Sequence, residues 1–441
     1  MKKYLYFLAV LLLMATGQSC SDDSDSPQEP VEETEETTTT TFEPKLAVTI
    51  PLTDKEKAMV SSLNQFFFKV FYISSVLEAE NGQLDYADKS AMMSPLSLSY
   101  ALGMLQSGAE GSTRREILSA MGLKSCSTDE VNDLFAKLIE WLPRVDTTAT
   151  LQVANAVFTN SDHNVTLLNS FSQQMQDYYQ AETFGIPYSD PSSVAAINQW
   201  CSTHTGGLIP EIVEELPQGI MDILNAIYLK AQWKKPFAEA QTLVAPFYNA
   251  QEKASNVMMM HQVSQMGYAS HNSYNAISMP FASENLRFVV LLPHTQQIYD
   301  YYGMLEEIQH KGIEDALTFK KTHYVNLSLP QFETNDSFDN LVSTMQQLGM
   351  ISAFNPEAAR LSKMVANTGI YVSSIRQKTS ISIKEAGLKA AAVTIVEMKE
   401  GASPYKESEL IGFNADHPFI YCITEQSTGL ILFIGRYAGE E

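Results

Sequence analysis

The sequence predicts an α+β fold, in which helical patterns gather early in the globular region and strand patterns gather late. Residues 96–105 repeat apolar side chains at helical spacing, whereas residues 325–329 alternate apolar and polar side chains. The regular alternation of strands and helices that a doubly wound parallel sheet requires is not found. The globular region of about 390 residues exceeds the usual size of a single core, so it forms two domains or one large fold.

Two helices are expected before residue 125. Residues 113–122 (TRREILSAMG) place Thr113 and Glu116 at the spacing of a capping box, which predicts a helix that begins at Thr113. Residues 96–105 (LSLSYALGML) form the other helix, which Gly108 ends. One face of that helix is apolar and carries Leu98, Ala101, Leu102 and Leu105.

Three strands are expected after residue 285. Residues 288–293 (FVVLLP) and 430–435 (LILFIG) are continuous apolar runs, which is typical of strands that are covered on both faces. In residues 325–329, Val325, Leu327 and Leu329 alternate with polar residues, as in a half-buried strand.

The N-terminus has the pattern of an export signal. Lys2 and Lys3 precede a twelve-residue apolar run that is too short to span a bilayer, so residues 1–19 are expected to be a signal peptide. Cys20 follows directly and resembles the lipidated cysteine of bacterial lipoproteins, although Gly17 stands where leucine is usual. We expect an outer-membrane lipoprotein that faces the cell surface or the periplasm; the alternative is a secreted protein with an unpaired cysteine.

The segment that follows is an acidic tether. Residues 20–50 hold many acidic and few apolar side chains, and such a segment cannot bury enough apolar surface to offset the entropy of ordering. The globular domain is therefore expected at residues 51–441. The membrane would be contacted only through the lipid anchor.

The charge balance disfavours polyanionic partners. The chain has 29 basic and 51 acidic residues, and its densest basic group is the pair Arg114 and Arg115. Nucleic acids and heparin-like polysaccharides require clustered lysine and arginine, so neither is expected as a partner.

The remaining cysteines and histidines predict no catalytic or metal chemistry. Cys126, Cys201 and Cys422 show no CxxC spacing, and an odd number argues against a disulfide framework, so buried free thiols are expected. The eight histidines form no HxxxH or HExxH motif, and no GxSxG or phosphate-loop motif occurs. We therefore expect no enzyme activity, no metal and no cofactor.

Several ordered motifs, spread from about Leu63 to Tyr437, resemble the serpin family of serine protease inhibitors. Taken together they are specific, although any one alone would be a weak signal. The segments that carry the resemblance are residues 92–118, 153–158 (VANAVF), 197–212, 224–237 (LNAIYLKAQWKKPF), 329–350 and 413–436.

The resemblance implies a fold of three β-sheets, eight or nine helices and an exposed reactive-centre loop. A target protease attacks this loop as a substrate and forms an acyl-enzyme, after which the cleaved loop inserts into the main sheet and traps the protease. A monomer is expected. Insertion between two strands favours slim side chains, and the hinge of the loop corresponds to Glu385, Gly387, Leu388, Ala390, Ala391, Ala392 and Thr394.

This chain departs from the family pattern at three positions. Leu388 stands where inhibitory members carry threonine or serine, so insertion is expected to be slower, and Lys389 replaces glutamate at a solvent-facing position. Gln377 replaces a histidine, and we expect it to bond to both Asn225 and Ser94 without pH dependence.

The resemblance also assigns two control regions in the sheet. Ser94, Ser97, Asn225 and Gln377 correspond to the hydrogen-bonded shutter under the sheet opening. Trp233 corresponds to the breach, where the loop first enters. Simple packing is the alternative role for this tryptophan.

The family spacing places the reactive bond about sixteen residues after Glu385, between Gly401 and Ala402. A shift of one residue gives Glu400–Gly401 or Ala402–Ser403 instead. Small residues at the bond favour elastase-like or subtilisin-like serine proteases, and cysteine proteases stay open as targets.

Two other functions stay open. The same fold occurs in non-inhibitory binding proteins, whose loops carry unsuitable hinge residues. A surface glycan-binding lipoprotein would share the tether and the acidity, but it would need exposed aromatic platforms and no hinge.

Overall fold

The computed structural model describes most of the globular region, and its described residues belong to one compact unit. In that part of the chain no helix has both the length and the hydropathy needed to cross a lipid bilayer. The described residues are 48–80, 89–163, 165–207, 209–216, 219–338, 341–366, 370–373, 375, 377–388, 406 and 409–439.

Nine α-helices and fifteen strands are found in the described part of the chain. The helices are α1 Asp54–Glu80, α2 Pro95–Gly108, α3 Gly111–Ala120, α4 Thr128–Trp141, α5 Asn169–Tyr179, α6 Ser192–His204, α7 Ile298–Lys311, α8 Ile313–Ala316 and α9 Val342–Gln347. The strands are β1 Ala91–Met93, β2 Thr150–Asn160, β3 Glu182–Ile186, β4 Met221–Gln232, β5 Leu243–Tyr248, β6 Ala254–Ser270, β7 Tyr274–Pro280, β8 Leu286–Pro293, β9 Thr322–Pro330, β10 Phe332–Phe338, β11 Gln377–Lys384, β12 Gly387–Leu388, β13 Ile411–Asn414, β14 Phe419–Glu425 and β15 Ile431–Tyr437.

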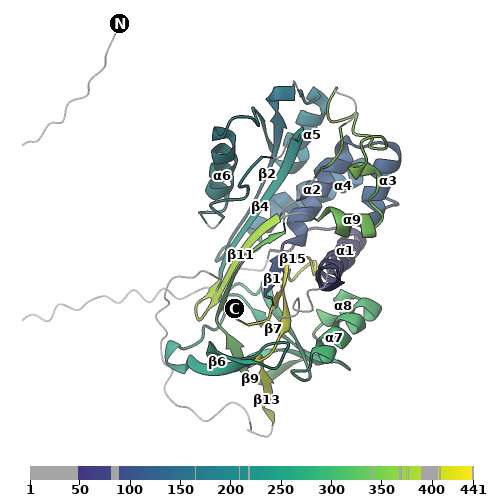
Figure 1. Ribbon diagram of the computed structural model, residues 1–441. Helices are drawn as coiled ribbons and strands as arrows, with labels where there is room; N and C mark the ends of the chain where they lie inside the picture. The colour runs from purple at the N-terminus through teal and green to yellow at the C-terminus, as the bar shows by residue number, and fades with distance from the viewer. Residues whose placement is uncertain are drawn as a thin grey trace, which may run out of the picture. The chain divides into compact units, whose positions relative to one another are not determined.

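The main sheet has six strands in the order β10-β11-β12-β4-β2-β3. Figure 1 shows its long strands β2, β4 and β11 side by side, with α6 on one face and α2 on the other. The two faces bury different sets of side chains because successive residues of a strand point in opposite directions. On β2, Ala156 and Phe158 pack with Trp200 of α6, whereas Val157 joins the larger core on the α2 side.

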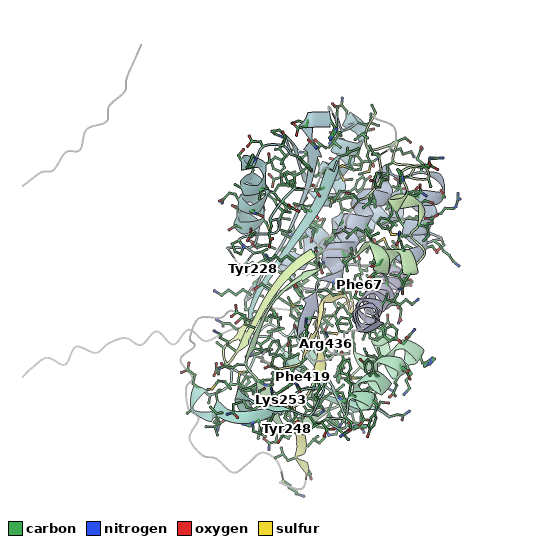
Figure 2. The ribbon with its side chains drawn as sticks, in the orientation of Figure 1. Phe67, Tyr228, Tyr248, Lys253, Phe419 and Arg436 are labelled. Carbon is green, nitrogen blue, oxygen red and sulfur yellow. The ribbon has the colours of Figure 1, made fainter. Side chains whose placement is uncertain are left out.

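The second sheet joins nine strands in the order β1-β15-β14-β8-β7-β6-β9-β13, with β5 paired to β6. The long strand β6 connects two parts of this sheet, because its start pairs with β5, its middle with β9 and its end with β7. The family resemblance implied three β-sheets. Besides the main sheet, the other two are joined here into one nine-stranded sheet through the shared strand β6. The interior between the sheets and helices includes Phe67 and Phe419, which Figure 2 labels and which are fully buried.

Most predicted elements are confirmed. The helix at 96–105 is α2, and the expected strands correspond to β8, β9 and β15. Val325, Leu327 and Leu329 of β9 are fully buried, as their alternation predicted.

The capping box predicted at Thr113 is wrong. Helix α3 begins two residues earlier, at Gly111, so Thr113 is a buried residue within the helix. Its hydroxyl accepts a hydrogen bond from the distant Arg360 N–H at 3.0 Å. The carboxylate of Glu116 instead accepts bonds from the N–H groups of Ile351 and Ser352. Both side chains bind a distant segment, and the local spacing gave no information about it.

The three described cysteines are free and buried, as expected. Burial raises the pKa of the Cys201 thiol to about 12, and it raises the pKa of Cys422 further. Thiols with such pKa values are protonated at neutral pH, so these two cysteines are poor nucleophiles.

Candidate functional site

The chain that leaves β11 turns back and begins a new strand in the middle of the main sheet. Gly387 and Leu388 form β12, which is antiparallel to both of its neighbours. Leu388 pairs with Ile383 of β11 on one side and with Ala231 of β4 on the other. The hinge predicted from the sequence is thus already seated in the sheet for two residues.

Gly387 has a backbone conformation that other residues cannot adopt without strain. Its φ angle is +131°, which L-residues rarely adopt. A Cβ atom added here would lie 2.3 Å from the carbonyl oxygen of Ala231 and 2.8 Å from the Cα atom of Gln232. Glycine is therefore required because the returning chain passes against the backbone of β4.

Leu388 is 2% exposed and belongs to the main hydrophobic core. Burial of a leucine side chain contributes about 1.5–3 kcal/mol. Leu388 was expected to slow insertion of the loop. In the structure its burial instead stabilises β12, the two-residue strand that is already inserted. A hydroxylated residue at this position would bury less apolar surface.

Glu385 is fixed at the turn that precedes β12. Its carboxylate accepts a hydrogen bond from the Thr242 hydroxyl at 2.7 Å and another from the Gln331 side chain. Its backbone carbonyl accepts a bond from the Phe237 N–H at 3.0 Å. Residues from two separate segments, the connection between β4 and β5 and the junction of β9 and β10, thus hold the start of the hinge. Sequence reasoning did not find them because they are distant from Glu385 in the chain.

Trp233 packs at the same end of the sheet and bonds to the turn directly. Its indole N–H donates a 2.9 Å bond to the Lys384 carbonyl, and its backbone N–H donates a 3.1 Å bond to the Ala386 carbonyl. The ring is stacked on Phe281 with 4.7 Å between the centroids and 6° between the planes. Trp233 therefore packs at this end of the sheet, which was the alternative role, and also bonds to the turn before β12; its control of loop entry stays a prediction.

Beyond Leu388, β11 and β4 share no backbone pair among the described residues. A cavity of about 90 Å³ lies in this opening, and it is lined by α2 on one face of the sheet and by Ile212 and Val213 on the other. The apolar face of α2 that the sequence predicted lines this cavity. The lining residues from α2, β4, β11 and the chain just before β11 include Leu98, Ala101, Leu102, Leu105, Ile223, Asn225, Ile375 and Gln377.

The shutter residues meet under this opening, but they do so differently from the expectation. The Gln377 side chain forms two bonds to the Ser94 backbone, accepting from its N–H at 3.0 Å and donating to its carbonyl at 2.7 Å. The Ser94 hydroxyl caps α2 by accepting from the Ser97 N–H, and it donates to the Leu432 carbonyl. The expected contact of Gln377 with Ser94 is confirmed.

The expected bond from Gln377 to Asn225 is absent among the described residues. The Asn225 amide group donates to the Asn155 side chain at 2.7 Å, and the Ser97 hydroxyl reaches the backbone carbonyl of Asn225 at 3.4 Å. The side-chain carbonyl oxygen of Asn225 is buried and has no hydrogen-bond partner among the described residues. The opening separates Gln377 from Asn225, which leaves this acceptor unsatisfied.

Other predicted site residues lie outside the described residues. They are the lipidation candidate Cys20, the hinge residues Ala390, Ala391, Ala392 and Thr394, and the reactive-bond candidates Glu400, Gly401, Ala402 and Ser403.

The described geometry is suited to receiving a strand. Two parallel strands stand apart with a two-residue antiparallel strand between them at one end. A chain that continued from Leu388 would pair with backbone groups on both sides and cover the apolar face of α2.

Comparison with known proteins agrees with this geometry. The family model for serpin (serine protease inhibitor) matches residues 64–439. The human leukocyte elastase inhibitor is 31% identical over 367 residues, which cover 78% of this chain and 92% of that protein. The rat glia-derived nexin is 28% identical and covers 79% of this chain and 87% of its own length.

Solved structures show the same fold. The native state of tengpin, a thermophilic serpin, matches with a TM-score of 0.76 and 25% identity, over 89% of this chain and 96% of that one. Human thyroxine-binding globulin complexed with thyroxine matches with a TM-score of 0.75 and 27% identity, over 87% of this chain and all of that one. The chain therefore belongs to the serpin family of serine protease inhibitors.

Proposed function

We propose that this protein inhibits serine endopeptidases by covalent trapping, in which the cleaved reactive loop inserts between β4 and β11. The observation that carries the proposal is the pairing of Gly387 and Leu388 between these strands, above an unfilled opening. The first two residues of the inserting strand are in register, so extension requires no rearrangement of the hinge.

The register of β12 supports the proposed reactive bond. Leu388 pairs with Ala231 of β4 and with Ile383 of β11. If the inserted strand continued from Leu388 in the same antiparallel register, Thr394 would lie opposite both Asn225 and Gln377. The same count places residue 398 opposite Met221, where β4 begins. The inserted strand would thus end three residues before Gly401, which leaves a short connection to a protease acylated there.

Insertion needs apolar burial as well as hydrogen bonds. Each new ladder hydrogen bond contributes about 0.5–1.5 kcal/mol, and ordering each residue's backbone costs about 1–2 kcal/mol. Ladder bonds alone therefore do not drive the reaction. Alternate residues after Leu388 would face the apolar side chains of α2 that line the opening, and this burial adds the missing contribution.

We propose an elastase-like or subtilisin-like protease as the target. Gly401 and Ala402 are small residues, which suit a protease with a shallow primary specificity pocket. The name of the human relative, leukocyte elastase inhibitor, supports the same class. Cysteine proteases are a further class to test.

The test is to mix the purified chain with pancreatic elastase, subtilisin, trypsin and papain, and to separate the products on denaturing gels. An SDS-resistant band at the summed mass of protease and inhibitor supports the proposal, and mass spectrometry of the released C-terminal peptide identifies the bond. A protease with its catalytic serine replaced by alanine is the control and should give no band. Cleavage without such a band, and without a rise in melting temperature, contradicts the proposal.

A non-inhibitory binding function is the second candidate. The observation that favours it is the likeness to human thyroxine-binding globulin, whose TM-score of 0.75 is close to that of tengpin. The same gel experiment separates the two candidates, because a binding protein would be cut without forming a complex.

We propose that the protein acts as a monomer tethered to the outer membrane through a lipid on Cys20. The support is the sequence pattern of residues 1–50. Labelling with radioactive palmitate, compared between the native chain and Cys20→Ser, tests the anchor. Equal labelling of the two proteins would contradict it, and proteinase treatment of intact cells would show which side the domain faces.

A further inference from the structure

Helix α6 and the chain that follows it cover the opening of the main sheet on the face opposite α2 (Figure 1). Ile212 and Val213, which come after the helix, line the cavity in the opening. The Asn198 side chain of α6 accepts hydrogen bonds from the N–H groups of Ile212 and Val213 at 2.8 and 3.0 Å, and it donates to the Val213 carbonyl at 2.8 Å. Residues 192–207 and 209–213 therefore form one unit, the α6 cover.

The α6 cover lies over the strands on both sides of the opening. At the end of α6, a Cβ atom added to Gly206 would lie 3.8 Å from the ring of Tyr228 on β4, which Figure 2 labels. Burial is the main cause of the raised pKa of Cys201, and the charge of Lys378 on β11 opposes it, so α6 is also close to β11. A strand that continued from β12 would fill the space between β4 and β11. The α6 cover must therefore shift when a strand enters.

His204, the last residue of α6, lies between two hydrogen-bond acceptors. Its Nδ1 atom is 2.8 Å from the carbonyl oxygen of Trp200, and its Nε2 atom is 3.2 Å from a carboxylate oxygen of Glu182 on β3. The Trp200 indole N–H donates to the same carboxylate oxygen at 3.1 Å. Strand β3 pairs with β2 at the edge of the main sheet and does not border the opening. The contact therefore joins the α6 cover to a strand that insertion does not separate.

A neutral imidazole cannot satisfy both acceptors of His204. It has one N–H group and one lone pair, so one nitrogen would present its lone pair to an acceptor oxygen. The imidazolium donates from both nitrogens, and a positive charge is favourable at the C-terminal end of a helix. The contact between His204 and Glu182 is therefore complete only in the protonated form. Histidine side chains change their charge between about pH 5 and 8.

The other groups around α6 do not provide a competing partner for the imidazole. Glu182 is the one described carboxylate within 4.0 Å of it. Strand β2 has no charged side chain. Burial raises the pKa values of the titratable groups Cys201, Tyr188 and Tyr228, so they are uncharged at neutral pH. The remaining charged residues of β4, β11 and the segments next to α6 are Asp190, Glu211, Glu214, Glu215, Asp222, Lys230, Lys378 and Lys384. Most of them are acidic, which favours the protonated form of His204.

We propose that His204 is a proton-dependent clamp, which holds the α6 cover to Glu182 when it is protonated and thereby slows strand insertion. The stabilising contribution is fully present below the range in which histidine titrates, and it is lost as the pH rises through that range. The inhibitor would therefore trap proteases more slowly in acidic than in neutral surroundings. This consequence rests on the proposed function, whereas the clamp itself does not.

Hydrogen exchange followed by mass spectrometry tests the clamp in the intact chain without any protease. Protection of peptides from residues 198–207 is compared at pH 5.5 and 7.5, after correction for the intrinsic exchange rates. We expect protection in the native chain to be about 3- to 10-fold greater at pH 5.5, as one further hydrogen bond to a charged group predicts. His204→Gln should show the same protection at both pH values. Glu182→Gln should also lose the pH dependence, although it retains an acceptor for the Trp200 indole.

The matched control is His310→Gln. His310 is in the last turn of α7, is exposed, and forms no hydrogen bond or ion pair with a described residue. Its substitution should leave the pH dependence of α6 unchanged. Equal pH dependence of α6 in the native chain and in His204→Gln would overturn the clamp.

A second measurement tests the effect of the clamp on insertion. A fluorescent synthetic peptide with the sequence of residues 389–400 is added to the intact chain, and its entry is followed by fluorescence anisotropy. Entry into the native chain should be about 3- to 10-fold slower at pH 5.5 than at pH 7.5, and the two rates should be equal in His204→Gln. Entry rates in the native chain that do not change with pH, despite pH-dependent exchange, would overturn the control of insertion.

The failure of the proposed function would be recognised separately. In that case no protease gives an SDS-resistant complex with the native chain, yet the exchange and peptide-entry results still depend on His204. Such a result would support the clamp and refute covalent trapping.

Discussion

The indole N–H of Trp233 donates a 2.9 Å hydrogen bond to the backbone carbonyl of Lys384, the last residue of β11. This bond joins the end of β4 to the end of β11 at the point where the chain turns into β12. Trp233 therefore helps to fix the turn between the two flanking strands, together with the bonds that hold Glu385.

We expect Trp233→Phe to destabilise the intact protein by about 1–3 kcal/mol, because the Lys384 carbonyl loses its bond in a buried place. The phenyl ring retains part of the stacking on Phe281. Urea unfolding followed by circular dichroism measures the change. Trp141→Phe, at the end of α4, is the control and should have a smaller effect. Equal effects of the two substitutions would contradict a special role for Trp233.

Leu388→Glu should convert the protein from an inhibitor into a substrate. The substitution places a carboxylate in a core position that is 2% exposed, and burial of an unpaired charge costs several kcal/mol. The protease would then deacylate before the strand inserts. The measurement is the ratio of SDS-resistant complex to cleaved chain after reaction with elastase. Leu388→Val, which removes one methylene group, should still form the complex.

Acid should weaken the segment that precedes β7 through Glu307 on α7. Burial opposes ionisation of this carboxyl, but hydrogen bonds from Lys311, Ser273 and the Asn272 N–H outweigh it and lower its pKa to about 2. A carboxyl with a lowered folded-state pKa stabilises the protein fully above its unfolded pKa. That contribution disappears as the pH falls from about 4.5 towards 2.

Glu307→Gln should therefore destabilise the protein by about 1–3 kcal/mol at pH 7, and by much less at pH 2.5. Urea unfolding at the two pH values measures this difference. Glu306→Gln, on the same helix, is the control because no comparable set of bonds is found at that residue in the described structure. A destabilisation by Glu307→Gln that is the same at both pH values would contradict the assignment.

Patterns with a fixed period were enough to predict the elements that frame the opening. The apolar face of α2 and the alternation in β9 follow from local geometry, because burial repeats with the period of the helix or the strand. Gly387 could be assigned from residue type alone, since few other residues tolerate its φ angle.

Contacts between distant segments could not be predicted in the same way. Thr113 and Glu116 had the spacing of a local cap, yet both bond to residues more than 230 positions away. Gln377 has groups that fit both Ser94 and Asn225, and only the separation of β4 from β11 decides that it bonds to Ser94. The groups that hold Glu385 come from Thr242 and Gln331, which no sequence pattern connects.

The unsatisfied side-chain oxygen of Asn225 leads to a last prediction. Thr394 lies outside the described residues, but the register of β12 places it opposite Asn225 once the loop inserts. Its hydroxyl can then donate to the oxygen that lacks a partner in the intact protein. One such bond contributes about 0.5–1.5 kcal/mol, and leaving the acceptor unsatisfied costs about 1–3 kcal/mol.

We therefore expect Thr394→Val to lower the melting temperature of the cleaved form while the intact form is unchanged. Differential scanning calorimetry of both forms, before and after limited cleavage by subtilisin, measures the two values. Valine has nearly the same shape as threonine, so the loss reports the hydroxyl and not a change in packing. Asn225→Ala combined with Thr394→Val should then show less than the sum of the two single effects in the cleaved form, because both substitutions remove the same bond. Additive losses, or an equal loss in the intact form, would place Thr394 elsewhere and refute the register on which the insertion depends.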